Sequence, residues 1–113
     1  HHKNKLDYPS GTALMLANAV CNGKGKTFKN LKGKIYLNKN GPLSNNKINF
    51  YVKRRGKTIG EHSVNFNNNF ETIKISHTAY SRELFAKGAL DAAIWLVKKK
   101  KGLYNMKDLL KLN

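Results

Sequence analysis

The first regular pattern in the chain is a set of apolar positions at helical spacing near its start. These positions would lie on one face of a helix, and they are Ala13, Leu14, Ala17 and Cys21. We predict a helix from about Thr12 to Cys21. Ser10 is its expected N-cap, because a serine hydroxyl readily accepts a hydrogen bond from an amide of the first helical turn.

Beyond this helix the pattern changes. Residues 22–46 are rich in Gly, Lys and Asn and contain one short apolar stretch at 35–37, so a long loop with one brief strand is expected. Three strand-like runs follow, at residues 48–53, 58–66 and 70–77. Because the turns between these runs are short, we expect an antiparallel meander.

The last third of the chain returns to helical spacing. Ser81 is the expected N-cap of a long helix with an apolar face, formed by Phe85, Gly88, Ala89, Ala92, Trp95 and Leu96. Gly102 is the expected capping glycine after it, and a short helix at about 106–112 ends the chain. The order helix, strands, helix predicts an α+β domain, with helices packed on one face of a small mixed or antiparallel sheet.

The composition limits which classes of protein fit these elements. A chain of 113 residues with 40% hydrophobic positions is large enough for one domain with a core. No stretch approaches the roughly 18 to 20 apolar residues that a membrane helix needs. The single cysteine, Cys21, fits a reducing compartment and leaves no multi-cysteine zinc site. Because the sequence opens with His1 and a polar segment rather than Met or a signal peptide, we expect a piece of a longer protein.

The charge raises a first hypothesis about function. Lys and Arg number 22 against 6 Asp and Glu, a formal net charge of +16. A nucleic-acid-binding module is therefore one candidate, and Phe50, Tyr51 and Phe66 would lie on strands beside Lys53 and Arg54. Against it, the lysines are spread evenly along the chain, with no aromatic and basic motif of the kind that RNA-binding sheets use.

The densest group of reactive side chains is the first dozen residues. His1 and His2 can exchange protons near neutral pH, and the Lys5 ammonium can neutralise an anion and donate a proton. The amides and hydroxyls of residues 10–12 lie at a helix N-terminus, where they would suit a carboxylate or a phosphate. The alternative is that Ser10 only caps a helix and the rest is a solvated end.

The same segment resembles a known family. The motif His-His-x-x-Lys-x-Asp-x-Pro-Ser-Gly-Thr-Ala at residues 1–13 resembles the signature of bacterial dihydrodipicolinate reductases, also called 4-hydroxy-tetrahydrodipicolinate reductases, of lysine and diaminopimelate biosynthesis. Further matches follow in order at residues 54–62, 76–89, 95–96 and 102–108. The resemblance spans almost the whole chain and is weakest over residues 22–46.

The resemblance implies a domain organisation. Members of the family bind NADH or NADPH with an N-terminal Rossmann domain, and bind substrate and form tetramers with a C-terminal domain. This chain has no Gly-x-Gly-x-x-Gly after a strand, so residues 1–113 would be the C-terminal domain, incomplete on its N-terminal side. Its residues 103–113 would pack on the missing nucleotide domain. The sheets would join in a cytoplasmic homotetramer.

The resemblance also implies roles for single residues. His1 would be the proton donor and acceptor, Lys5 the proton donor and His2 a substrate contact. A substrate carboxylate would be bound by Ser10, Gly11 and Thr12. The implied reaction is the NAD(P)H-dependent reduction that gives tetrahydrodipicolinate, and a planar dicarboxylate substrate agrees with a cationic, donor-rich site.

Other polar residues are weaker candidates. A histidine in a strand is usually a hydrogen-bonded structural residue, which is the expectation for His62 and His77. Arg54 and Arg55 are expected to be a solvated strand end, with contact to an anionic ligand as the alternative. The four histidines have no carboxylate or cysteine at ligand spacing, so no metal site is expected.

Overall fold

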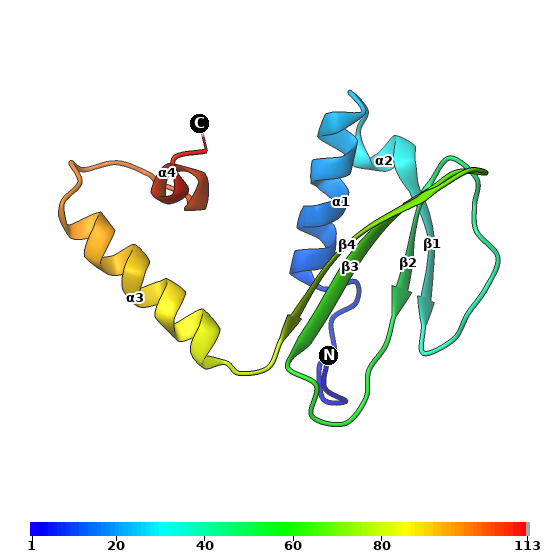
Figure 1. The fold of residues 1–113 in the computed structure, drawn as a ribbon, viewed down its shortest axis with the longest axis horizontal. Helices are drawn as coiled ribbons and strands as arrows, with labels where there is room; N and C mark the ends of the chain where they lie inside the picture. Colours follow the sequence, from blue (N-terminus) through cyan, green and yellow to red (C-terminus); the bar gives the residue numbers. More distant parts are fainter. Residues whose placement is uncertain (113) are drawn as a thin grey trace. The chain divides into compact units, whose positions relative to one another are not determined.

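The computed structural model describes residues 1–112, and the chain forms two compact units, residues 1–80 and a unit that begins at Ser81 (Figure 1). The first unit holds six elements, which are α1 (Gly11–Gly23), α2 (Phe28–Leu31), β1 (Lys32–Leu37), β2 (Ile48–Val52), β3 (Gly60–Asn67) and β4 (Thr72–Ala79). The second unit holds α3 (Glu83–Val97) and α4 (Met106–Leu110). The predicted α+β class is confirmed.

Helix α1 begins as the sequence predicts. Ser10 is its N-cap, with an extended backbone and a hydroxyl oxygen that accepts a hydrogen bond from the Ala13 amide at 3.2 Å. Ala17 and Cys21 form its buried face, and Cys21 is only 2% exposed. The helix continues two residues further than predicted, to Gly23.

Residues 22–46 contain more regular structure than predicted. The short helix α2 begins after Thr27, whose hydroxyl accepts a hydrogen bond from the Asn30 amide at 3.4 Å. Strand β1 then covers residues 32–37 instead of 35–37 alone. A helix of four residues is too short to show a period, and the lysines and glycine at the start of β1 carry no strand signal.

The predicted antiparallel meander is wrong for β2 and confirmed for the β3–β4 hairpin. The described strands form two separate two-stranded sheets: β1 and β2 are parallel, and β3 and β4 are antiparallel. Strand β2 has β1 as its parallel partner instead of β3. The turn at residues 53–56, which follows β2, is hydrogen-bonded through its backbone to residues 1–3.

Helices α1 and α2 pack on the β1–β2 pair. The core consists of Ala17 from α1 and of Phe50 and Val52 from β2, with Phe28 of α2 edge-on to Phe50 at a ring distance of 6.2 Å. The expected packing of helices on one face of a sheet is therefore present for these two helices. It also fixes α1, and with it the helix N-terminus at residues 10–12.

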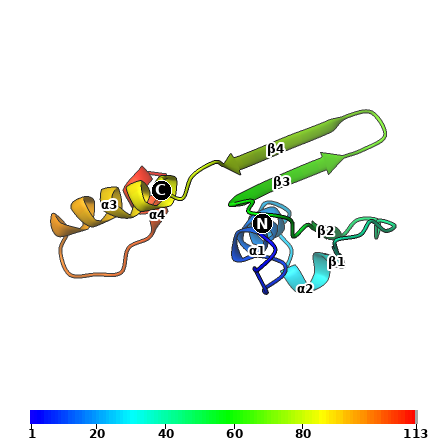
Figure 2. The ribbon, with the colours of Figure 1, turned by 90° about the horizontal axis from the view of Figure 1, so that it is seen from below.

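The β3–β4 hairpin has one apolar and one polar face. Val64 lies opposite Ile75 and Phe66 lies opposite Ile73, and these four side chains share a face with the pair His62 and His77. Figure 2 shows the hairpin lying apart from the β1–β2 pair. In the single chain Phe66 is 41% exposed, Ile73 53% and Ile75 65%.

The second unit differs from its prediction at the helix ends. Arg82 is the N-cap of α3 and makes no side-chain capping bond, whereas the Ser81 hydroxyl accepts from the Glu83 amide at 3.1 Å. The helix ends with Lys98 as its C-cap, so Gly102 is not the capping glycine. Helix α4 ends at Leu110, two residues early, and begins with a capping box between Asn105 and Asp108.

Candidate active site

The segment of residues 1–3 lies along the turn at residues 53–56. The His1 backbone nitrogen donates to the Lys53 carbonyl oxygen at 3.1 Å, and the Arg55 amide donates to the His1 carbonyl oxygen at 3.0 Å. The Lys3 amide donates to the Gly56 carbonyl oxygen at 3.1 Å. These bonds place the His1 side chain beside β3, although the two segments are about fifty positions apart in sequence.

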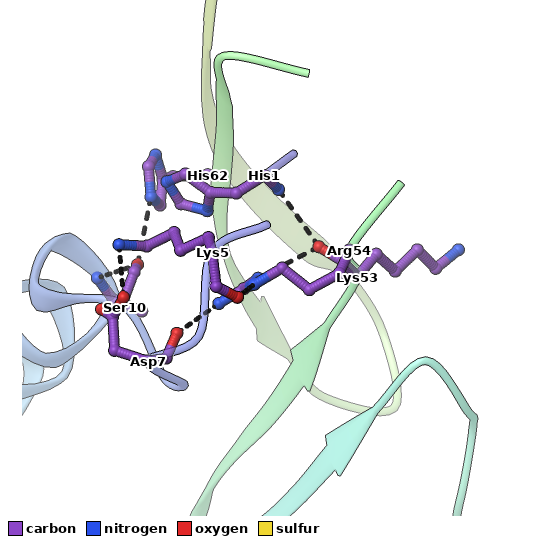
Figure 3. A network of polar contacts seen from close by, with 8 residues as sticks. His1, Lys5, Asp7, Ser10, Lys53, Arg54 and His62 are labelled. Carbon is purple, nitrogen blue, oxygen red and sulfur yellow. Dashed lines mark hydrogen bonds and ion pairs between the residues drawn. The ribbon is translucent and has the colours of Figure 1, made fainter. Parts of the chain in front are cut away.

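Arg54 holds the next part of the segment through its side chain. Its Nε donates to the carbonyl oxygen of Lys5 at 3.1 Å, and its Nη2 donates to that of Asp7 at 2.6 Å (Figure 3). Its own backbone amide donates to Oδ1 of Asn38, just after β1, at 2.7 Å. Arg54 is therefore half-buried and bonded to main-chain oxygens, so the expectation of a solvated strand end is wrong for this residue.

Lys5 and Asp7 form an ion pair in this loop. The Lys5 ammonium donates to Oδ1 of Asp7 at 2.7 Å, and the Lys5 side chain is the more shielded of the two. The hydrogen bond from Lys5 is the main reason why the pKa of Asp7 lies below its ordinary value. An ammonium has three donors, so two of them stay available for a ligand.

His1, His62 and Ser10 form a connected group. The His1 and His62 rings meet edge to face with centroids 4.8 Å apart. Nε2 of His62 shares a hydrogen bond with the Ser10 hydroxyl at 3.3 Å, and the ring tautomer sets which atom donates. The same hydroxyl caps α1, so one buried serine ties the helix N-terminus to β3 and to His1 (Figure 3).

The environment of His62 favours its neutral form. Burial lowers the pKa of His62 below its ordinary value, and electrostatic repulsion from the opposing His77 lowers it further. A neutral ring is the form that can accept a hydrogen bond from Ser10 at pH 7. His62 is thus a hydrogen-bonded residue of the site wall, as the sequence predicts.

The N-terminus of α1 completes the site. The first intrahelical bond runs from the Leu14 amide to the Ser10 carbonyl, and the Ala13 amide is bonded to the Ser10 hydroxyl. The amides of Gly11 and Thr12 point out of the helix end, as those of any first turn do, and both residues are exposed. An anion placed here would meet two amides, the Thr12 hydroxyl and the positive end of the helix dipole.

Comparison with known proteins agrees with the resemblance in the motif. Residues 1–110 match the family described as "Dihydrodipicolinate reductase, C-terminus". This chain belongs to that family. A 4-hydroxy-tetrahydrodipicolinate reductase of Pelagibacter ubique is 54% identical over 97% of the chain and 43% of its own length. One of Buchnera aphidicola from Cinara cedri is 49% identical over 98% of the chain and 41% of its own length.

The relatives are longer proteins. A third, the 4-hydroxy-tetrahydrodipicolinate reductase of Methanoregula boonei, is 44% identical over 99% of the chain and 42% of its own length. The chain thus spans about two fifths of each relative. Within residues 1–112, no helix is long and apolar enough to cross a membrane, and no group of three or more His, Cys, Asp or Glu is placed to hold a metal ion.

The reductase-family domain brings together most of the side chains that the sequence singles out. His1 and Ser10 meet through His62, and Lys5 extends toward Asp7 and the start of α1 (Figure 3). His2 is half-buried, and its carbonyl accepts a turn bond from the Lys5 amide at 3.2 Å. Sequence reasoning missed the roles of Arg54 and Asp7. No local signal could have revealed that Arg54 bonds residues 47 to 49 positions away.

Proposed function

We propose that this chain is the substrate-binding and proton-donating part of a 4-hydroxy-tetrahydrodipicolinate reductase. In the whole protein, NADH or NADPH would reduce a cyclic dicarboxylate to tetrahydrodipicolinate in cytoplasmic lysine and diaminopimelate biosynthesis. The observation that carries the proposal is the arrangement of residues 1–13. It joins an ammonium, an imidazole and an open helix N-terminus within the family's signature segment.

The helix N-terminus is suited to a substrate carboxylate. The Gly11 and Thr12 amides and the Thr12 hydroxyl would donate to its oxygens, while the helix dipole favours the negative charge. Ser10 contributes by fixing this end, since its hydroxyl is already engaged by the Ala13 amide and His62. His2, half-buried in the same segment, is the remaining candidate for a substrate contact.

The Lys5 ammonium and the His1 imidazole are the candidate proton donors. Lys5 keeps two donors beyond its bond to Asp7, so it can bind an anionic substrate and deliver a proton from Nζ. The His1 ring lies against His62 and can exchange a proton at a ring nitrogen. A proton delivered here would neutralise charge that develops on the substrate during reduction.

The nicotinamide cofactor would be held outside this chain. Within residues 1–112 no strand is followed by a Gly-x-Gly-x-x-Gly turn and a helix, so these residues do not fit a dinucleotide. When bound by the rest of the protein, the cofactor would supply the hydride. The residues of this chain bind and orient the acceptor and donate the proton.

The β3–β4 hairpin supports assembly as a homotetramer. Phe66, Ile73 and Ile75 lie on one exposed face of the hairpin in the single chain. A contiguous apolar surface of this kind is typical of an interface between subunits. We therefore propose that this face is covered by other copies of the chain, as the resemblance implies.

The structure gives little support to the alternative of a nucleic-acid-binding module. Base stacking needs exposed aromatic faces. Phe50 is only 7% exposed and belongs to the core, and the Tyr51 ring is stacked on Tyr36 with centroids 5.3 Å apart. Of the three aromatic side chains that motivate this alternative, Tyr51 is 44% exposed but has one ring face covered by Tyr36, and Phe66 is 41% exposed on the hairpin face just described.

An assay of the full-length protein tests the proposed function. We expect NADH or NADPH oxidation that depends on 4-hydroxy-tetrahydrodipicolinate, and competitive inhibition by pyridine-2,6-dicarboxylate, a planar analogue. Thr12→Val should weaken the inhibitor by about tenfold or more, since it removes a hydrogen bond to a charged group. Thr27→Val, which changes the cap of α2 instead, is the matched control. Absence of turnover together with absence of inhibitor binding would refute the proposal.

A further inference from the structure

Arg54 has an unusual set of partners for an arginine next to an active site. Its three guanidinium nitrogens all donate to main-chain carbonyl oxygens: Nε to Lys5, Nη2 to Asp7 and Nη1 to Lys53. Among the described residues, the carboxylate that is bonded to a side chain of this turn is that of Glu61 on β3, and its partner is the neighbouring Arg55. The planar fork of a guanidinium can hold two acceptors in fixed directions, which an ammonium cannot do.

We propose that Arg54 is the positioning residue for Lys5: its guanidinium grips the loop on both sides of Leu6 and so sets where the Lys5 ammonium lies. This inference rests on the proposed function, because it takes Lys5 to be a proton donor. Arg54 itself does not touch the substrate in this role. It acts through the backbone of the residues that carry the donor.

The loop depends on this grip. Residues 4–9 contain no helix or strand, and the described hydrogen bonds within the loop are the Lys5 amide to His2 turn and the Lys5 to Asp7 ion pair. Arg54 supplies the described hydrogen bonds that join residues 4–9 to a segment distant in sequence. A lysine side chain has four rotatable bonds, so its amine reaches a fixed point only if its backbone is fixed.

Arg54 is in turn well anchored. Its backbone amide is bonded to Asn38, just after β1, and it lies two residues after Val52, the last residue of β2 and part of the core. The position of the loop is thus tied to the β1–β2 sheet, the same sheet that supports α1. The Lys5 ammonium and the N-terminus of α1 are therefore both supported by the β1–β2 sheet.

A double-mutant cycle in the full-length reductase tests the proposal. Arg54→Ala should lower kcat by about ten- to a hundredfold, because small displacements of a catalytic group have effects of this size. In the Lys5→Ala background the same change should lower the residual kcat by less than about threefold, since there is no ammonium left to position. Arg55→Ala removes the same charge one residue away and should stay within about twofold of wild type.

Arg54→Lys separates the fork from the charge. The lysine keeps the charge but cannot bond the carbonyl oxygens of Lys5 and Asp7 together, so we expect a kcat about tenfold below wild type. In the Lys5→Ala background this loss should be absent. Arg54→Lys also carries the test if Arg54→Ala does not fold, as judged by circular dichroism. Guanidinium added to Arg54→Ala should restore part of the lost turnover.

Three results would overturn this role. They are a kcat within twofold of wild type for Arg54→Ala, full activity of Arg54→Lys, and an equal loss with and without Lys5. Equal losses would indicate a structural or substrate-binding arginine. Turnover by the wild-type enzyme is the separate readout for the proposed function: without it both proposals fail, and with it the cycle judges Arg54 alone.

Discussion

The segment of residues 1–10 has no helix or strand, yet it is tied by hydrogen bonds to residues 47 to 54 positions away. The β3–β4 hairpin is the opposite case. Its backbone is fully regular, but the side chains of β4 are exposed in the single chain, apart from Ala79. The first region is held in place by hydrogen bonds to other residues of the same chain. The second has an apolar surface that no other part of residues 1–80 covers.

This difference indicates that the candidate site and the proposed assembly surface belong to different regions of the chain. The candidate donors and the helix N-terminus are held by hydrogen bonds within residues 1–80, so their relative geometry is built within this chain. The hairpin adds the His62 contact at one end and the apolar side chains Phe66, Ile73 and Ile75 further along. Chemistry and assembly should therefore respond to different substitutions.

The largest effect is expected at Lys5. In the full-length enzyme, Lys5→Ala should lower kcat by about a hundredfold or more, the usual range for loss of a proton donor, and His1→Ala should act in the same direction. Steady-state kinetics with NADPH or NADH measures the change. The assembly seen by analytical ultracentrifugation should stay that of the wild type.

Lys3→Ala is the matched control for this prediction. Lys3 is an exposed lysine two residues away whose backbone amide, not its side chain, makes the described bond to Gly56. Its substitution should leave kcat close to the wild-type value. If Lys5→Ala and Lys3→Ala had equal effects, the reactivity of the segment would be a matter of net charge and not of a positioned donor.

The second prediction concerns the hairpin. Ile75→Asp places a charge on the apolar face, and burying an unpaired charge in an interface is costly, so the enzyme should sediment as smaller species. Asn65→Asp adds the same charge on the other face of the hairpin and should leave the assembly intact. A tetramer that survives Ile75→Asp but not Asn65→Asp would place the interface on the polar face instead.

The sequence predicts those parts of both regions that have local signals. The cap at Ser10, the strand β2 and the two strands of the hairpin follow from spacing and turn residues, and they are confirmed within a few positions. The parallel pairing of β1 with β2 is not predictable in this way. It depends on which strand pairs with β1 across the loop at 38–47, and the lysines and glycine in the first half of β1 give no signal for this.

The site follows the same rule. The motif at residues 1–13 identifies which residue types are present, and the resemblance assigns them roles. The contacts that fix them come from Arg54 and His62, which belong to segments that local reasoning reads as an exposed strand end and a structural strand. A hydrogen bond between Arg54 and Asp7, which are 47 positions apart, gives no periodic pattern in the sequence.

A third, smaller effect is expected at Ser10. Ser10→Ala removes the cap of α1 and the bond to His62 and should lower the stability of the domain by about 1 to 2 kcal/mol. Thermal unfolding of the full-length enzyme measures it. Thr27→Ala removes the cap of the four-residue helix α2 and should cost less, because its hydrogen bond is longer and reaches no other element. An equal loss for both would mean that the link between Ser10 and His62 contributes nothing to stability.

The smallest effect is the pH dependence of the Lys5 to Asp7 pair. The pKa of Asp7 is lowered in the folded state by its bond to Lys5, so the carboxylate stabilises the fold above its unfolded pKa of about 3.8, and this contribution is lost as the pH falls through the lower, folded pKa. Asp7→Asn should therefore lower the unfolding temperature near neutral pH, and its difference from wild type should shrink as the pH falls below 3.8. High salt should reduce the difference in unfolding temperature between wild type and Asp7→Asn, since the carboxylate is exposed.

Asp91→Asn is the control for this prediction. It removes the longer Lys87 to Asp91 pair on α3 and should change the unfolding temperature less. A difference between wild type and Asp7→Asn that grows toward low pH would mean that the ion pair does not lower the pKa of Asp7.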